Sequence, residues 1–309
     1  MAEWALVCSR LQDVNELDAC LNLDTTRSGR LGELQTEARE AARAAFGPPR
    51  FTRLYYGTEF CERLVPTVSH VRQAYEAAAA RRLGVSLLTP YLTDAGLDRL
   101  RPVFDWLADL EDSSIEVVVN DWGTLHVLRR DFPGLRPILG RLMNRLLRDP
   151  RIAGEFAGSG APVPAVTALR QSSVSAAVFR RFLTRHAIAR VEFDNLFQGL
   201  DMDFGALNLA ASLYIPYGYV ATGRVCPIGS LRLPATQKFD VESPCRQECR
   251  LYTLRFVYAD SPFENRDQEF FEQGNTYFYF QDRRMIASSA EMVERLGITR
   301  IVYQPRLPM

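Results

Sequence analysis

Short runs of β-branched and aromatic residues alternate along this 309-residue chain with segments that have the hydrophobic spacing of helices. Most of the short runs are continuously apolar, which is typical of parallel strands covered on both faces. The pattern predicts eight strands, which are Trp4–Cys8, Arg53–Gly57, Val85–Leu88, Ile115–Asn120, Pro137–Gly140, Ala189–Asp194, Leu209–Ile215 and Arg300–Tyr303.

The segments between the strands carry helical periodicity. In Asp94–Glu111 leucine and phenylalanine recur every three or four residues, which predicts a helix with one buried stripe. Val174–His186 repeats this spacing. Near the end of the chain, the spacing of Ser288 and Glu291 predicts a capping box, and Gly297 is expected just past the end of that helix.

The alternation of eight strands with helices predicts an α/β fold of the (β/α)8 TIM-barrel type, as a single domain over residues 1–309. A doubly wound open sheet is the alternative. Two segments depart from the rhythm. We expect a helical insertion at 23–50, between the first two strands, and a second insertion at 225–275, after the seventh strand, which carries three cysteines.

The charge balance argues against some partners and mechanisms. Lys+Arg and Asp+Glu are equal at 37 each, whereas proteins that bind nucleic acid through its phosphates usually carry a basic excess. A nucleic-acid partner is therefore not expected. Lys238 is the one lysine of the chain, so mechanisms built on a lysine Schiff base would depend on a single residue and are disfavoured.

The first residues, Met1–Cys8, have no basic segment followed by a long apolar run, so they do not resemble a secretory signal. No stretch approaches the roughly 18 apolar residues that a membrane span needs. We therefore expect a cytoplasmic protein. Thiols stay reduced in that compartment, so the six cysteines are expected as structural thiols, metal ligands or nucleophiles and not as disulfides.

Four cysteines are candidates for one site. Cys226, Cys245 and Cys249 fall within the second predicted insertion, and Cys245 and Cys249 would share one helix face if that segment is helical. Cys61 follows the second predicted strand, and Cys226 follows the seventh. Residues that follow barrel strands lie on the same face of a barrel, so these cysteines are expected to lie near one another.

Three interpretations of these cysteines remain open: scattered core thiols, a zinc site or an iron–sulfur cluster. Zinc knuckles favour a Cys-x2-Cys spacing, whereas the Cys-x3-Cys spacing with distant partners fits a cluster better. The other two cysteines, Cys8 and Cys20, lie in apolar patterns and are expected as ordinary buried thiols.

Four segments of the chain resemble those of the collagenase-like U-thirty-two peptidase family, and they are Leu54–Cys61, Val117–Gly123, Tyr217–Cys226 and Pro244–Cys249. The likeness is greatest to the iron–sulfur branch of the family, which acts in oxygen-independent ubiquinone biosynthesis. It extends over most of the chain, from about residue 53 to 305.

The resemblance implies a barrel-like fold and a [4Fe–4S] cluster held by Cys61, Cys226, Cys245 and Cys249. It also implies a component of an oxygen-independent hydroxylase that acts on a small aromatic or isoprenoid substrate, as a heterodimer with a paralogous iron–sulfur protein. The alternatives are an RNA hydroxylation factor and a non-catalytic subunit for electron transfer or structure. Peptidase activity is not expected, because the chain has no Ser/His/Asp arrangement and no His-Glu-x-x-His motif.

Catalytic residues are less clearly marked than the cysteines. Asp121 lies just past the fourth predicted strand, where either a functional group or a turn is natural. Tyr217 is a candidate for substrate contact or for core packing. Arg224 lies two residues before Cys226, where a cation would stabilise a negatively charged cluster. The three histidines lie in apolar contexts typical of structural histidines, and they are His70, His126 and His186.

Overall fold

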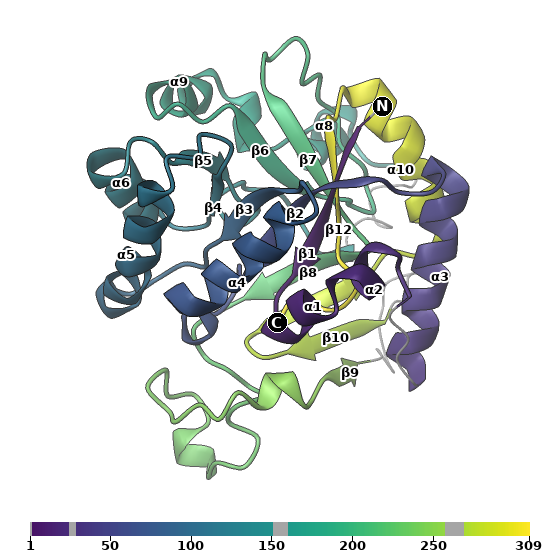
Figure 1. The fold of residues 1–309 in the computed structure, drawn as a ribbon. Helices are drawn as coiled ribbons and strands as arrows, with labels where there is room; N and C mark the ends of the chain where they lie inside the picture. Colours follow the sequence, from purple (N-terminus) through teal and green to yellow (C-terminus); the bar gives the residue numbers. More distant parts are fainter. Residues whose placement is uncertain (1, 25–28, 151–159, 257–268) are drawn as a thin grey trace.

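Eight parallel strands close into a barrel in the computed structural model, which describes residues 2–24, 29–150, 160–256 and 269–309 (Figure 1). Around the barrel the order is β1-β12-β7-β6-β5-β4-β3-β2. The strands are β1 (Glu3–Cys8), β2 (Phe51–Gly57), β3 (Gly84–Leu88), β4 (Glu116–Val119), β5 (Arg136–Leu139), β6 (Arg190–Asp194), β7 (Ala210–Ile215) and β12 (Arg300–Tyr303). The predicted TIM-barrel-like fold and its eight strands are confirmed, and the open sheet is excluded.

Helices surround the barrel, and within the described residues none is long and apolar enough to cross a membrane. The predicted stripe of α5 (Asp94–Asp109) is confirmed, because Leu100, Phe104 and Leu107 are buried. Thr93 caps this helix by accepting from the N–H of Gly96. The longer helices are α3 (Gly29–Phe46), α4 (Val68–Ala79), α5 (Asp94–Asp109), α6 (Trp122–Asp131), α8 (Val163–Arg170), α9 (Ala177–Arg185) and α10 (Arg283–Leu296), and the shorter ones are α1 (Leu11–Asn15) and α2 (Leu17–Leu21).

One expectation about a helix is wrong. The last helix, α10, begins at Arg283 with Asp282 as its cap, and Asp282 accepts from the N–H of Met285 at 2.8 Å. Ser288 therefore lies inside the helix and is not its cap, although Gly297 ends it as expected, with φ of 71°. The segment at 23–50 is helical as expected, since α3 lies within it and follows α1 and α2 in the connection between β1 and β2.

The insertion after β7 forms a second sheet, which the hydrophobic pattern did not predict. Its strands are antiparallel, in the order β8-β11-β10-β9. Figure 1 shows the sheet lying across the carboxyl end of the barrel. Residues 257–268 of the predicted insertion lie outside the described part of the chain. The bounds are β8 (Tyr217–Thr222), β9 (Leu254–Phe256), β10 (Phe270–Gln273) and β11 (Thr276–Phe280).

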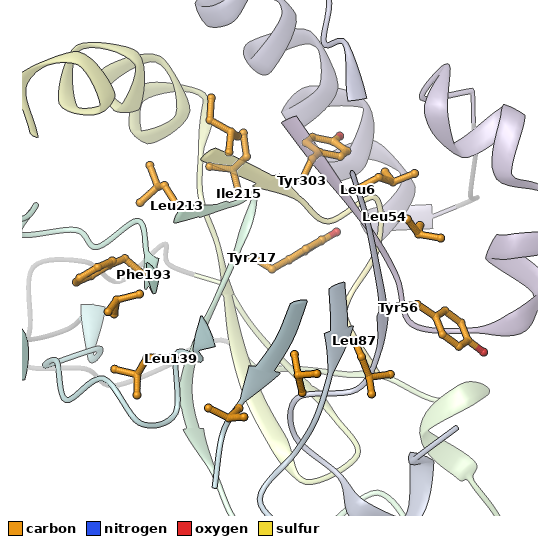
Figure 2. Close-up of a cluster of buried hydrophobic side chains, with 14 of the residues drawn as sticks. Leu6, Leu54, Tyr56, Leu87, Leu139, Phe193, Leu213, Ile215, Tyr217 and Tyr303 are labelled. Carbon is orange, nitrogen blue, oxygen red and sulfur yellow. The ribbon is translucent and has the colours of Figure 1, made fainter. Parts of the chain in front are cut away.

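The main core lies between the barrel strands and the helices. Leu6, Leu54, Phe193 and Leu213 point out of the barrel and are completely buried. Figure 2 shows these side chains in a ring, with Tyr217 of the second sheet in the middle. The second sheet is therefore packed onto the barrel as part of one core.

The inside of the barrel is only partly apolar. A layer that includes Val7, Leu88 and Val118 resembles the usual filling of a TIM barrel. Below this layer, buried Arg300 pairs with Glu116 at 2.7 Å and with Glu3 at 2.7 Å. The barrel thus carries buried ion pairs in a place where hydrophobic residues normally predominate.

Candidate functional site

One cavity of about 350 Å³ is lined by Cys61, Cys226, Cys245 and Cys249. Cys61 comes from the loop after β2, and the other three come from the segment between β8 and β9, which we call the cysteine lobe (residues 224–252). The cysteines that the sequence places in the core, Cys8 and Cys20, are completely buried and do not line this cavity. Segments that are distant in the sequence thus bring four thiols to one site.

The segment that joins Cys245 to Cys249 is not helical, so the conditional prediction of a shared helix face is wrong. Gln247 adopts the left-handed conformation, with φ of 58° and ψ of 38°. A single 3-10 turn, Glu248–Arg250, follows it and contains Cys249. A tight turn, not a helix, therefore brings the two thiols of the Cys-x3-Cys pair to the cavity.

Backbone N–H groups point at three of the four sulfurs. Gly229 donates to Sγ of Cys226 at 3.3 Å, and Gln247 donates to Sγ of Cys245 at 3.4 Å. The backbone N–H of Arg63 donates to the sulfur of Cys61. Donors of this kind stabilise negative charge on sulfur and are a common surrounding of metal-bound thiolates.

The thiols hold their protons firmly in the absence of a metal. Burial, together with the neighbouring cysteines, raises the pKa of Cys61 to about 11 and that of Cys249 to about 12. Burial also raises the pKa of Cys226. Binding of a metal would therefore release protons, because the thiolate and not the thiol is the ligand.

In the part of the chain that the structure describes, no three Cys, His, Asp or Glu side chains form a group that could hold one metal ion. Thiolates around one zinc ion lie only ~3.8 Å apart, given Zn–S distances of ~2.3 Å and tetrahedral geometry. A four-iron cluster spaces its thiolates more widely than a single zinc ion does.

Arg63 joins the two segments that supply the cysteines. Its guanidinium donates to the backbone carbonyl of Ser243 at 2.8 Å and to that of Val241 at 2.8 Å. Arg63 lies two residues after Cys61, and Ser243 lies two residues before Cys245. The sequence gives no signal of this contact, because it spans 180 residues and follows no motif.

Polar groups fix the wall of the cavity on the side of β3. Burial raises the pKa of Glu62, but hydrogen bonds from Thr93 outweigh it and hold that pKa below its ordinary value. The hydroxyl of Tyr91 donates to the carbonyl of Gly223 at 2.5 Å and accepts from Asn275 at 3.0 Å. These contacts link the loop after β3 to the second sheet.

The three weak catalytic candidates have different outcomes. Asp121 caps α6 by accepting from the N–H of Thr124 at 3.0 Å, which favours the turn interpretation. Tyr217 is completely buried in the core, which favours packing over substrate contact. Neither lines the cavity, whereas Arg224 does.

A buried ionic network, which the sequence pattern did not predict, lies at the barrel mouth. Arg141 is completely buried and pairs with Glu59 at 2.5 Å and with Asp194 at 2.7 Å. Arg148 pairs with the same Asp194 at 2.7 Å, and Tyr219 of β8 donates to the carbonyl of Arg141 at 3.1 Å. Glu59 and Arg141 each follow the end of a barrel strand by two residues, and Asp194 is the last residue of β6. The rule that selected Asp121, a polar residue at the end of a barrel strand, could therefore have found these three residues. The network fills the mouth, and the cavity lies beside it.

No family model matches the chain, and no curated protein matches it. Among solved structures, it is similar to a glycoside hydrolase family 18 N-acetylglucosaminidase from Paenibacillus barengoltzii (9% identity, 98% of this chain and 94% of that chain, TM-score 0.33). It is also similar to the spore cortex-lytic enzyme SleL of Bacillus megaterium QM B1551 (10% identity, 98% and 70%, TM-score 0.29) and to the chitinase ChiW of Paenibacillus sp. str. FPU-7 (11% identity, 82% and 38%, TM-score 0.24). These values are too low to carry an argument about activity.

Proposed function

We propose that this chain is an iron–sulfur protein that holds one [4Fe–4S] cluster through Cys61, Cys226, Cys245 and Cys249. The observation that carries the proposal is the common cavity of these four thiols, which arrive from two distant parts of the chain. Four thiolates are the usual ligand set of such a cluster. The sulfurs also have N–H donors at Cys61, Cys226 and Cys245, as a negatively charged cluster requires.

We further propose that the chain is a component of an oxygen-independent hydroxylase, similar to the UbiV-type proteins of the U-thirty-two peptidase-like family. Such a protein works on a small aromatic or isoprenoid substrate with a paralogous, UbiU-like partner. The support for this step is the order of the family-like segments and the cysteine set. A bound cluster would supply electron transfer, while the protein's own Arg63 and Arg224 would position the lobe and balance the charge of the site.

One observation favours a role as a subunit over a complete enzyme. The barrel mouth, where TIM-barrel enzymes hold their substrates, is filled by Arg141 and covered by Tyr219. The remaining cavity lies at the rim, where a second chain can reach it. Hydroxylation that needs the co-purified partner would support this role, and full turnover by the isolated chain would exclude it.

The cluster is tested by the iron and sulfide content of anaerobically purified protein. We expect about four iron atoms per wild-type chain and a large loss in each of Cys61→Ala, Cys226→Ala, Cys245→Ala and Cys249→Ala. Cys8→Ala and Cys20→Ala are the matched controls, because these thiols are buried outside the cavity. A wild-type protein that holds no iron after anaerobic reconstitution would refute the proposal, and zinc in place of iron would replace it with a zinc site.

A further inference from the structure

The cysteine lobe exposes an unusual number of apolar side chains. Of the ten large hydrophobic residues that are exposed within the described residues, seven lie between positions 231 and 277. Phe239 and Leu251 are the most exposed of these, at 81% and 80%. We call five of them the apolar face of the lobe, and they are Leu231, Phe239, Val241, Leu251 and Tyr252.

The apolar face adjoins the cavity at one residue. Val241 lines the cavity directly, and Leu251 follows the ligand candidate Cys249 by two residues. The guanidinium of Arg232 donates to the hydroxyl of Tyr252 at 3.3 Å, which joins the two ends of the lobe. In Figure 1 the lobe (green) projects from the end of the molecule that carries the second sheet.

The lobe also carries cations that have no ion-pair partner. The lobe has three carboxylates, and two of them accept from backbone N–H groups: Asp240 accepts from the N–H of Glu242 at 2.9 Å, and Glu248 accepts from that of Arg246 at 3.1 Å. Within the described residues, none of the five cations of the lobe forms an ion pair, and they are Arg224, Arg232, Lys238, Arg246 and Arg250. With five cations and three carboxylates, the lobe combines exposed apolar side chains with a net charge of +2.

This combination fits a lipid surface better than a protein partner. The core of a protein–protein interface is a packed patch that is depleted of charge. Between residues 231 and 252 only Cys249 is buried, so the lobe offers loop tips and not a packed platform. Exposed Phe and Leu side chains interspersed with Arg and Lys are typical of segments that enter the headgroup region of anionic membranes.

We propose that the cysteine lobe docks on an anionic lipid surface, with Phe239 and Leu251 entering the headgroup region and the lobe's cations contacting lipid phosphates. The docking goes beyond the iron–sulfur function, because it rests on exposed side chains and not on what the thiols bind. It places the cavity near the lipid surface, since Val241 of the apolar face and Arg224 of the lobe line the cavity.

The docking is tested by sedimentation of the full anaerobically purified chain with lipid vesicles. We expect binding to phosphatidylglycerol-containing vesicles, little binding to pure phosphatidylcholine, and release when salt is raised from about 0.05 to 0.5 M. Phe239→Ser together with Leu251→Ser should lower the partition coefficient at least ~10-fold. The matched control is Val163→Ser with Val178→Ser, because these residues are 77% and 70% exposed but lie outside the lobe.

Further measurements separate the contribution of charge from that of the apolar face, and lipid binding from dimer formation. Lys238→Glu with Arg246→Glu leaves the apolar face intact and should weaken binding to the anionic vesicles alone. Equal vesicle binding by wild type and the Phe239/Leu251 variant would overturn the proposal. A dimer in solution that dissociates in that variant would also overturn it, by assigning the face to a second copy. Iron content is measured on the same samples, so iron-free protein that still binds vesicles would refute only the proposed cluster.

Discussion

Arg63 shows how much a single side chain contributes to the candidate site. Its guanidinium donates two hydrogen bonds to backbone carbonyls of the cysteine lobe, at Val241 and Ser243. Arg63 lies two residues after Cys61, and Ser243 lies two residues before Cys245. A residue in this position sets the distance between the two segments that carry the ligand candidates, although it binds no metal itself.

Replacing Arg63 with Met should therefore loosen the site while leaving every thiol in place. Loss of groups that orient metal ligands typically costs 10–100-fold in metal affinity, so we expect the variant to lose iron at least ~10-fold faster to a chelator. Limited proteolysis should also cut the lobe faster. Arg284→Met, at an exposed position of α10, is the control. Iron retention and cleavage equal to wild type would show that the contact does not position the lobe.

At the scale of elements, the second sheet covers the barrel mouth through a close contact between β8 and β11. The ring of Tyr279 lies against the backbone of Gly218, so a Cβ at that position would come within 2.1 Å of the ring. The hydroxyl of Tyr279 donates to the carbonyl of Asn195 at 2.7 Å, which ties the sheet to the loop after β6. The absence of a side chain at Gly218 is therefore what lets the sheet pack closely.

Gly218→Ala should displace the Tyr279 ring and weaken its hydrogen bond. Overpacking of this kind usually costs ~1–3 kcal/mol, and we expect a loss of that size in the free energy of unfolding. Urea titration measures it, and Gly134→Ala is the matched control, because a Cβ there meets open space. If the two variants were equally stable, the close packing of the sheet on the barrel would not contribute to the stability of the fold.

At the scale of the whole molecule, the interior of the barrel contains both apolar side chains and buried ionisable side chains. Glu192 lies inside the barrel, where Tyr214 donates to it at 2.5 Å. Burial, together with the negative charge of Glu59, raises the pKa of Glu192 to about 8. At neutral pH this carboxyl is largely protonated, and the acidic partners of Arg141 are Glu59 and Asp194.

This raised pKa predicts how stability depends on pH. The unfolded chain has an ordinary Glu pKa of ~4.3, so the folded state binds the additional proton between that value and about 8. The contribution of Glu192 is therefore fully present below ~pH 4.3 and is lost as pH rises towards 8, by at most ~1.4 kcal/mol per pH unit. Glu192→Gln, which does not titrate, should flatten the fall of the unfolding midpoint between about pH 5 and 8. Parallel profiles for the variant and wild type would contradict the assignment, and Glu291→Gln on α10 serves as the control.

The barrel could be predicted from the amino-acid sequence because its signals are local. A strand buried on both faces has a continuous apolar run, and most of the barrel strands carry one close to the observed position, although β6 alternates charged and apolar residues. The strands of the second sheet were missed because they mix aromatic with polar residues, such as the buried Glu272 and Gln273 of β10. The grouping of three cysteines in one insertion was also visible locally.

Tertiary structure alone decided how the site is built. Arg63 and its partner Ser243 are 180 residues apart, and no local pattern connects them. The same holds for Arg141, whose partners Glu59 and Asp194 are 82 and 53 residues away. Hydrophobic periodicity reports only which face of an element is covered. The position of a polar side chain depends on which distant segments meet there, and closure of the barrel under the second sheet determines that.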